Sequence, residues 1–397
     1  MHVPLEKGKL RIGVDLVPLR PPLTGVGNYE LYLLAALLSR SDAPQVHGFA
    51  RRTWREVDAH YLDEIQLERP EGTWPGYARP LWLIKRSGIA REVFSWVRRH
   101  AFERSSDAKN LSLFHAFAYM APGKLSAPTI PVVYDLSFVR FPETHPPARL
   151  QRLRRLDTQL QAAPVVHTIS CFSAREIADI FGISLSRIAV IYPGVLPSLA
   201  KISSENPSEA LAKYKLEPGR FLLVVSTLEP RKNLRSLVIA YSRLSRADRN
   251  RLPLCVVGAA GWGSLDLPKS SQALKREGSL RFLGFVSNQH LRIFYTNTRA
   301  MFYPSIYEGF GMPIVDALAC GARVICSDAA AMPEAGGNVV RRVAPLDIDG
   351  WFREVQLAAE NADCDIEERN RRQLHAQQFT WERAAAQTMQ LYQRATA

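Results

Sequence analysis

Short apolar runs alternate with longer amphipathic segments along most of the chain. The apolar runs predict β-strands and the amphipathic segments predict helices. The predicted strands lie at 11–17, 111–117, 130–135, 165–170 and 188–195 in the first half, and at 221–226, 254–258, 280–286, 300–303 and 322–327 in the second. Strands that alternate with helices are typical of an α/β protein with parallel sheets.

A polar segment at 196–218, with Ser, Glu, Lys and Pro, interrupts this pattern. Such a shift in composition is typical of a connection between domains. A chain of 397 residues with 47% hydrophobic content is long enough to bury two cores. We therefore predict domains at 1–195 and 219–379, a linker at 196–218 and a terminal helical segment at 380–397. Residues 53–110 show no clear order of elements.

The sequence indicates an intracellular protein. No apolar run is long enough to span a bilayer, and the first ten residues contain Glu6, Lys7 and Lys9 in place of the apolar segment of a signal peptide. We therefore expect a cytoplasmic location. The five cysteines lie mostly within apolar patterns and lack the paired spacing of a zinc site, so we expect reduced packing residues.

The formal net charge of +13 raises the question of an anionic partner. The basic residues are spread over both halves of the chain, whereas a nucleic-acid site needs a concentrated basic patch, so we expect no nucleic-acid partner. The segment at 82–99 is an exception, because its cations are interleaved with Trp82, Trp96 and aliphatic residues. This pattern fits either a helix on an anionic membrane surface or an ordinary surface helix with its apolar side in the core.

The stretch at 300–321 contains the strongest candidate chemistry. Its apolar run leads through a glycine-rich loop into a short helix that begins at Pro313 and ends at Gly321. Glu308 in the loop and Asp316 in the first turn of the helix supply two carboxylates. In a parallel sheet this loop lies at the carboxyl ends of the strands, where such folds bind their ligands. The stretch therefore predicts a site for a polyhydroxylated, phosphorylated molecule.

Four glycines predict places where the backbone approaches a ligand closely. Gly309 and Gly311 lie in the loop before the candidate helix, while Gly25 and Gly27 occupy the turn between the first strand and a helix that we expect at 29–39, capped by Asn28. A lone Gly-x-Gly is also compatible with a tight turn and nothing more.

A second signal lies at Arg231 and Lys232. Both follow the strand at 221–226 and precede a predicted helix. Two cations at the carboxyl end of a strand, next to a helix N-terminus, form a candidate anion site. Arg231 offers a forked pair of donors and Lys232 a point charge.

The segment from Glu308 to Pro313, together with Asp316, resembles the Glu-x7-Glu motif of glycosyltransferase family 4, a family of retaining glycosyltransferases with the GT-B fold. That resemblance implies two Rossmann-like domains whose parallel sheets face each other across a cleft. In the family, the first acid contacts the donor sugar and the second the nucleotide ribose. The second acid is Asp here, so its shorter side chain affects the ribose contact. Phe310 lies within the motif.

The resemblance extends to other segments. Those around His115 and Asp135 are similar to family segments that line the sugar pocket, although Tyr134 replaces the usual His before the Asp. It implies catalytic roles for Glu308, His115 and Asp135; by residue type alone, a strand-end His is more often structural.

The remaining implied contacts concern the nucleotide and the domains. The resemblance implies that Gly25 and Gly27 face the donor diphosphate and that the turn at Phe285 and Val286 lies against the base. It also implies that the first domain shapes the acceptor site and that the terminal helix crosses back to it.

The resemblance implies transfer of a hexose onto a glycan or polyprenyl-linked glycan in bacterial polysaccharide synthesis. The segment from Glu229 to Asn233 resembles mannosyl- and rhamnosyltransferases, so GDP-mannose is the preferred donor; dTDP-rhamnose, a UDP-hexose or a nucleotide-sugar 2-epimerase remain alternatives. We expect no metal and no cofactor. The Asp-x-Asp sequences at 347–349 and 363–365 lie beyond the site-forming strands, and we interpret them as loop or helix-cap residues.

Overall fold

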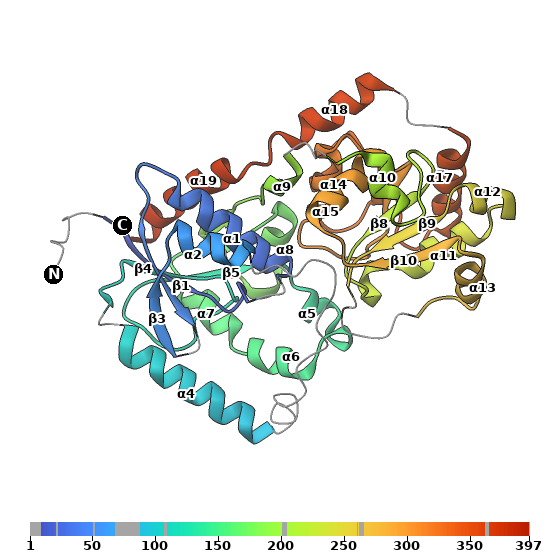
Figure 1. Cartoon of the computed structure of the whole chain (residues 1–397). Coiled ribbons are helices and arrows are strands. Elements are labelled where there is room, and N and C mark those ends of the chain that lie inside the picture. Colours follow the sequence, from blue (N-terminus) through green and yellow to red (C-terminus); the bar gives the residue numbers. More distant parts are fainter. Residues whose placement is uncertain are drawn as a thin grey trace.

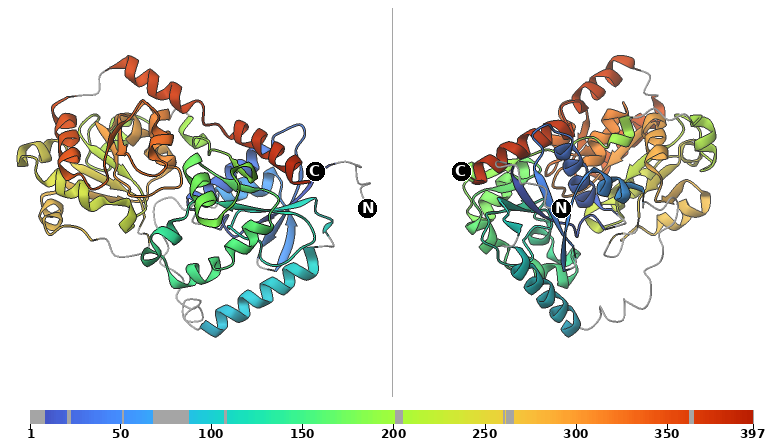
Figure 2. Two further views of the ribbon diagram at one scale, coloured as in Figure 1. Left: turned by 180° about the vertical axis from the view of Figure 1, so that it is seen from behind. Right: turned by 60° about the vertical axis from the view of Figure 1, so that its left-hand side comes forward.

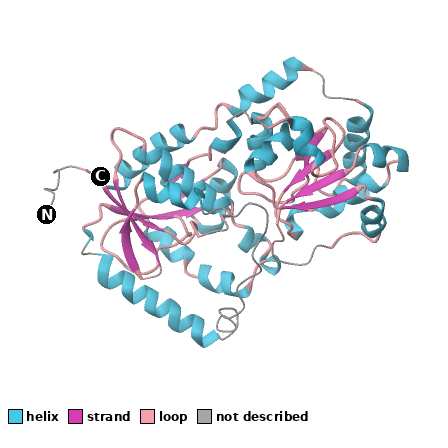
Figure 3. Ribbon diagram, viewed as in Figure 1, coloured by secondary structure: helices cyan, strands magenta, loops and turns pink. Residues whose placement is uncertain are grey.

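The computed structural model describes residues 9–20, 23–50, 52–67, 88–106, 109–200, 205–259, 261, 266–361 and 365–396. These residues form two α/β domains, each with a mainly parallel sheet flanked by helices (Figures 1 and 3). The fold class expected from the sequence is confirmed.

The first sheet has seven strands in the order β3-β2-β1-β4-β5-β6-β7. Its strands are β1 (Arg11–Asp15), β2 (Gln45–Ala50), β3 (Thr53–Glu56), β4 (Leu113–Ala116), β5 (Thr129–Val133), β6 (Val166–Thr168) and β7 (Ile188–Val190). All neighbours pair in parallel except β3, which runs antiparallel to β2. The sequence analysis did not predict β2, β3 or β13 (Arg341–Val343). β3 is an exposed edge strand without an apolar run.

The second sheet has six parallel strands in the order β10-β9-β8-β11-β12-β13. They are β8 (Leu222–Val225), β9 (Leu254–Val257), β10 (Leu280–Gly284), β11 (Ala300–Tyr303), β12 (Val324–Ser327) and β13 (Arg341–Val343). Because β8 has β9 on one side and β11 on the other, the connections diverge between β8 and β11. A crevice at the carboxyl ends of such strands is the usual ligand position of this architecture.

Helices cover both sheets. The first group comprises α1 (Gly25–Leu38), α2 (Ala59–Leu67), α4 (Gly88–Ser106), α5 (Ser137–Arg140), α6 (Pro147–Leu153), α7 (Leu156–Ala162) and α8 (Cys171–Phe181), with the 3-10 turns η2 (Pro142–Thr144) and η3 (Leu185–Arg187). The second comprises α9 (Pro197–Ala200), α10 (Pro207–Ala212), η4 (Pro230–Lys232), α11 (Leu234–Ser242), α12 (Arg246–Arg251), α13 (Ser270–Glu277), α14 (Asn288–Asn297), α15 (Met312–Ala319), α16 (Met332–Gly336), α17 (Ile348–Glu360) and α18 (Ile366–Ala376). α19 (Trp381–Thr396) follows α18.

The chain returns to the first domain at its end. α18 packs against α15 of the second domain, and α19 continues onto α1 of the first, as the red helices of Figure 2 show. Trp381 anchors this return, because its ring contacts Tyr29 and Tyr32 at 5.6 Å and its Nε1 donates to Val195 O at 2.8 Å. α19 therefore belongs to the packing of the first domain.

No helix within the described ranges is long and apolar enough to cross a membrane. Residues 82–87 of the basic aromatic segment lie outside the described residues, and the rest forms the beginning of α4. Cys171 is exposed, whereas Cys255, Cys320 and Cys326 are buried and free; Cys364 lies outside the described residues.

Candidate functional site

Two loops meet at the carboxyl edge of the second sheet. One follows β8 and contains Arg231 and Lys232 within η4, immediately before α11; the other follows β11 and contains Glu308 before α15. The strand order makes β8 and β11 neighbours, so these loops come together although they are far apart in the sequence. The backbone joins them directly, since Ile306 N donates to Arg231 O at 2.8 Å.

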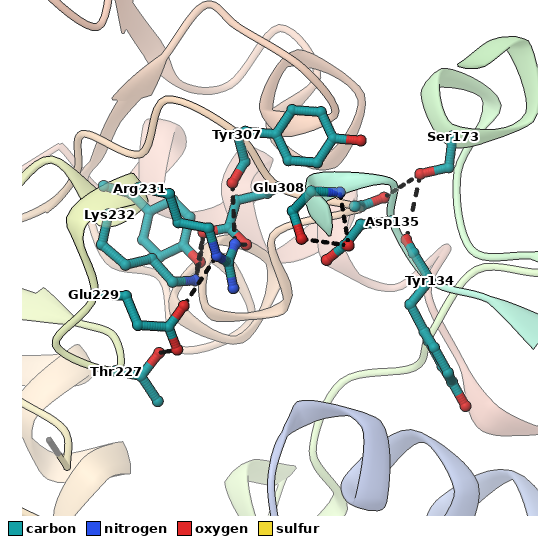
Figure 4. A network of polar contacts seen from close by, with 12 residues as sticks. Tyr134, Asp135, Ser173, Thr227, Glu229, Arg231, Lys232, Tyr307 and Glu308 are labelled. Carbon is teal, nitrogen blue, oxygen red and sulfur yellow. Dashed lines mark hydrogen bonds and ion pairs between the residues drawn. The ribbon is translucent and has the colours of Figure 1, made fainter. Parts of the chain in front are cut away.

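The Glu308 carboxylate binds both cations (Figure 4). Arg231 Nη1 donates to Glu308 Oε2 at 3.0 Å, and Lys232 Nζ donates to Glu308 Oε1. Tyr303 OH donates to the same Oε1 at 3.0 Å. Arg231 Nε in turn donates to Glu229 Oε2 at 3.0 Å. The cluster thus contains two cations and two carboxylates.

Charge pairing outweighs burial in the electrostatics of this cluster. Glu308 is 7% exposed. Burial alone would raise the pKa of Glu308, but the charges of Lys232 and Arg231 outweigh it and lower the pKa to about 2. Glu308 is therefore ionised at neutral pH, and a second anion entering the site would compete with it for the same cations.

Three further residues support the cluster, and the sequence analysis assigned no role to any of them. Glu229 accepts from Thr227 Oγ1 at 2.9 Å as well as from Arg231, and Tyr303 donates to Glu308. Asn233 has a left-handed backbone with φ of 52°, and its Nδ2 donates to Pro304 O at 3.0 Å and Pro345 O at 2.7 Å. An Asn directly before a helix was a usable signal, because Asn tolerates this conformation better than most residues.

Asp135 faces the cluster from the first domain (Figure 4). It follows β5, and its Oδ1 accepts from Ser137 N at 3.1 Å and Ser137 Oγ at 2.7 Å. A Cβ on Gly309 would lie 3.0 Å from the Asp135 Cβ, so the Glu308 loop reaches this residue. The structure therefore brings Asp135 of the first domain close to the Glu308 loop of the second.

His115 lies in a different place. It is fully buried in β4, where its Nδ1 bonds Tyr392 OH of α19 at 2.9 Å and its Nε2 bonds His167 Nδ1 at 2.9 Å. Tyr29 OH contacts His167 Nε2 at 2.8 Å and donates to Ile191 O at 3.1 Å. Burial, followed by the nearby His167, lowers the pKa of His115 well below its usual value. These contacts join α1, the first sheet and α19, and both ring nitrogens of His115 bond protein groups, so we do not propose a contact between His115 and the substrate.

Asp316 is buried in the second turn of α15, and the first turn contains no acidic residue, so its expected place in the first turn was wrong. Its Oδ1 accepts from Leu196 N at 3.0 Å. Burial raises the pKa of Asp316 to about 7, although the Leu196 N–H opposes this shift. Asp316 therefore ties α15 to the chain that links the two domains.

The glycines have mainly structural contacts. α1 begins at Gly25 with Thr24 as its cap, so the expected start at 29 and the Asn28 cap were wrong. A Cβ on Gly27 would lie 2.4 Å from Pro18 O, and one on Gly25 would lie 3.2 Å from Met312 Cε of the second domain. Gly25 thus stands where the beginnings of α1 and α15 approach each other.

Gly311 and Phe310, in the rest of the predicted loop, have structural contacts. Gly311 caps α15 with φ of 108°, a conformation that favours glycine. Phe310 is buried against the rings of Tyr192 and Phe379.

The predicted base-contacting turn follows β10. Phe285 is 46% exposed, whereas Val286 is buried. An exposed ring at the carboxyl edge of the sheet is available to a flat ligand.

The late Asp residues act as helix caps. Asp347 accepts from Gly350 N at 2.8 Å at the start of α17, and Asp365 accepts from Glu367 N at 2.9 Å at the start of α18. The cap interpretation is confirmed for these two residues. Within the described part of the chain, no group of three or more His, Cys, Asp or Glu residues is arranged to hold a metal ion.

Comparison with known proteins places this geometry in context. Residues 208–395 match the family model described as glycosyl transferases group 1. The chain is 30% identical over 380 residues to O-antigen chain mannosyltransferase B of Escherichia coli, an alignment that covers 94% of this chain and 97% of that protein.

The solved structures show the same fold. Sucrose-phosphate synthase of Thermosynechococcus elongatus superposes with a TM-score of 0.69 at 19% identity, covering 97% of this chain and 98% of that one. A glycosyltransferase of Rickettsia africae superposes with a TM-score of 0.64 at 16% identity, covering 97% of this chain and 98% of that one.

Proposed function

The chain belongs to the group 1 glycosyltransferases, glycosyltransferase family 4, and on this premise we propose that it transfers a hexose from a nucleotide sugar to a glycan or lipid-linked glycan. The cluster of Arg231, Lys232 and Glu308 is the observation that carries the proposal. It combines buried cations, which suit a diphosphate, with a buried carboxylate, which suits sugar hydroxyls.

Arg231 and Lys232 bind the donor diphosphate in this proposal. Arg231 uses Nε and Nη1 for Glu229, Tyr307 O and Glu308, and no described residue accepts a hydrogen bond from its Nη2. Lys232 Nζ has three protons and donates to Glu308 and Tyr303. Each cation thus retains a donor for phosphate oxygens while Glu308 holds it in position.

Glu308 accepts hydrogen bonds from hydroxyls of the donor sugar. When the nucleoside diphosphate departs, negative charge develops on its phosphate oxygens, and the preorganised cations stabilise that charge. The family resemblance supports retention through attack and departure on one face, with the leaving phosphate helping to deprotonate the acceptor. Asp135, which faces the cluster from the first domain (Figure 4), lies beside the sugar and acceptor in this proposal.

The remaining residues contact the nucleotide in this proposal. Phe285 lies beside the base because its ring is exposed at the same sheet edge, and the neighbouring Val286, which is buried, contributes its backbone. Gly25 and Gly27, at the beginning of α1, face the diphosphate. Asp316 accepts from the ribose with the lone pairs that the Leu196 N–H leaves available.

Mannose from GDP-mannose is the proposed donor group, and bacterial polysaccharide assembly the proposed setting. The support is the 30% identity to a protein named as an O-antigen chain mannosyltransferase, over nearly the whole of both chains. A polyprenyl-linked glycan is the matching acceptor. Transfer from dTDP-rhamnose or a UDP-hexose, and 2-epimerisation without an acceptor, are the alternatives that a panel of nucleotide sugars separates.

Peripheral contact with the inner face of the cytoplasmic membrane is the proposed location of the enzyme. In α4, Trp96 is 57% exposed and its ring lies 4.0 Å from that of His100, tilted by 36°, with Arg99 and Arg104 nearby on the same helix. An exposed tryptophan among cations is suited to the headgroup region of anionic lipids.

The nucleotide-sugar panel tests the proposed function. The protein is incubated with GDP-mannose, dTDP-rhamnose and UDP-hexoses, with and without lipid-linked mannan acceptors, and release of nucleoside diphosphate is measured. We expect acceptor-dependent release of GDP, strongly reduced in Glu308→Gln because the substitution removes the charge without changing the size. Release that is independent of an acceptor, or equal in the variant, would contradict the proposal.

A further inference from the structure

The three residues from Tyr307 to Gly309 are divided between the two domains. Glu308 binds Arg231 and Lys232 of the second domain. The residues on either side of it, Tyr307 and Gly309, contact the first domain. Both sequence neighbours of Glu308 are therefore held by the first domain. The position of the Glu308 carboxylate depends on where that domain lies.

Tyr307 inserts its side chain into the first domain. Its hydroxyl donates to Glu176 Oε2 on α8 and accepts from Leu136 N at 3.0 Å. Its ring packs edge-on against Phe141 and Phe172, both at 5.6 Å. The acceptor and the backbone donor that satisfy the hydroxyl thus both come from the other domain.

Glu176 is held in place for this contact. It is buried, and its second oxygen, Oε1, accepts from Arg140 Nε at 2.7 Å. Burying a carboxylate is costly unless it is paired, and Arg140 and Tyr307 together satisfy both oxygens. Loss of the Tyr307 hydroxyl leaves Glu176 with one of these partners.

Gly309 makes the second contact at close range. Its carbonyl accepts from Ser173 Oγ at 3.3 Å, and Ser173 lies three residues before Glu176, on the same face of α8. A Cβ at Gly309 would lie 2.0 Å from Tyr134 O. Any larger residue would therefore separate the loop from the first domain.

Glu334 makes a second contact between the domains. It does not bond Tyr307, Glu308 or Gly309 itself, although the ring of its partner Phe172 also packs on Tyr307. Glu334 of α16 accepts from the N–H groups of Cys171 at 2.6 Å and Phe172 at 3.1 Å, and from Tyr192 OH at 2.6 Å. These N–H groups belong to the first turn of α8, where a carboxylate is favoured. A Glu334 variant can therefore be compared with variants of Tyr307 and Glu176. Glu334 also bridges the domains, but it is not adjacent to Glu308 in the sequence.

We propose that Tyr307 is a positioning residue that holds Glu308 in its sugar-binding position when the domains are closed, and that Glu176 of α8 is the group that holds Tyr307. The proposal rests on the proposed function for the role of Glu308. The new element is that the site is complete only when the Tyr307 hydroxyl donates its hydrogen bond to Glu176 on α8 of the first domain.

Kinetics on five variants, including Glu334→Gln, test the proposal. Tyr307→Phe and Glu176→Ala each remove a charge-assisted hydrogen bond, and we expect kcat to fall by about ten-fold or more while the Kd for the nucleoside diphosphate changes by less than about two-fold. Glu176→Gln retains an acceptor oxygen and should restore most of kcat. Tyr214→Phe, which removes a hydroxyl bonded to His290 at 2.7 Å within the second domain, is the matched control and should behave as wild type.

Two kinetic results would overturn the proposal. One is wild-type kcat in Tyr307→Phe. The other is an equal loss of kcat in Glu334→Gln, because domain closure would then matter without a special role for Tyr307. If the wild-type protein shows no transfer with any nucleotide sugar, the proposed function fails instead.

Hydrogen exchange tests the positioning contact independently of activity. Tyr307→Phe and Glu176→Ala should increase deuterium uptake at 304–311 in the full-length protein, whereas Glu334→Gln should increase it at the beginning of α8. Unchanged uptake at 304–311 in both Tyr307→Phe and Glu176→Ala would overturn the positioning role even in the absence of an assay.

Discussion

Arg231 Nη1 lies 3.0 Å from Glu308 Oε2, although 77 positions separate the two residues in the sequence. The contact exists because β8 and β11 are neighbours in the second sheet, which places the loops that follow them side by side. The pair is buried, so removal of either member takes away one of the two charged partners that the other has among the described residues: Arg231 keeps only Glu229, and Glu308 keeps only Lys232. Substitutions in the cluster must therefore be compared for stability as well as for binding.

The first prediction concerns the donor diphosphate. Arg231→Ala and Lys232→Ala each remove a charge-assisted contact of about 1.5–3 kcal/mol, so the Kd for a nucleoside diphosphate should rise by about ten- to hundred-fold. Isothermal titration calorimetry measures this Kd. Arg235→Ala removes an exposed arginine of α11 paired with Asp266 and serves as the control. Wild-type affinity in a folded Arg231→Ala, Lys232→Ala double variant would reject the assignment.

The second prediction concerns Asn233. Asn233→Gly removes the hydrogen bonds to Pro304 O and Pro345 O but suits the left-handed backbone, whereas Asn233→Ala removes the same bonds and adds strain. The Ala variant should therefore be less stable than the Gly variant by about 1 kcal/mol, and both should be less stable than wild type. Urea unfolding gives these differences. Equal stability of the two variants would show that the backbone conformation of Asn233 carries no strain.

The third prediction concerns the pH dependence of stability at Asp316. Its pKa is about 7 in the folded protein, compared with about 3.9 for an exposed Asp. The folded state therefore holds this proton more tightly than the unfolded state. The difference in pKa adds at most about 4 kcal/mol to the free energy of unfolding. This contribution is fully present below about pH 4 and is lost as the pH rises through about 7.

Asp316→Asn cannot ionise, and its side-chain oxygen can still accept from Leu196 N. The melting temperature of the variant minus that of wild type should therefore be more positive at pH 8 than at pH 5. Thermal unfolding at both pH values measures the difference, with the exposed Asp157→Asn as control. A difference between Asp316→Asn and wild type that does not change with pH would contradict the prediction.

The fourth prediction concerns α4. Trp96→Ala should reduce cosedimentation with vesicles that contain anionic phospholipid, because it removes the exposed ring that would enter the headgroup region. Binding should also fall with added salt, since part of the attraction is screened charge. Leu185→Ala, which removes an exposed apolar side chain on η3, is the matched control. Absence of binding, or equal binding to neutral vesicles, would show that α4 is an ordinary surface helix.

The sequence by itself determined the alternation of strands and helices, the two domains, and the loops that contain Arg231, Lys232 and Glu308. These features depend on local patterns: apolar runs mark buried parallel strands, and cations before a helix or glycines in a loop are visible within a few residues. The cap roles of Asp347 and Asp365 were accessible for the same reason.

Only the tertiary structure decided which of these residues meet. Strand order brings Arg231 to Glu308, and the docking of α8 onto the second domain brings Glu176 to Tyr307. The tertiary structure also places His115 in hydrogen bonds with His167 and Tyr392, because α19 returns to pack on the first domain. The physical reason is that a sequence pattern reports periodicity and local conformation, whereas these pairs depend on the distances between elements after packing.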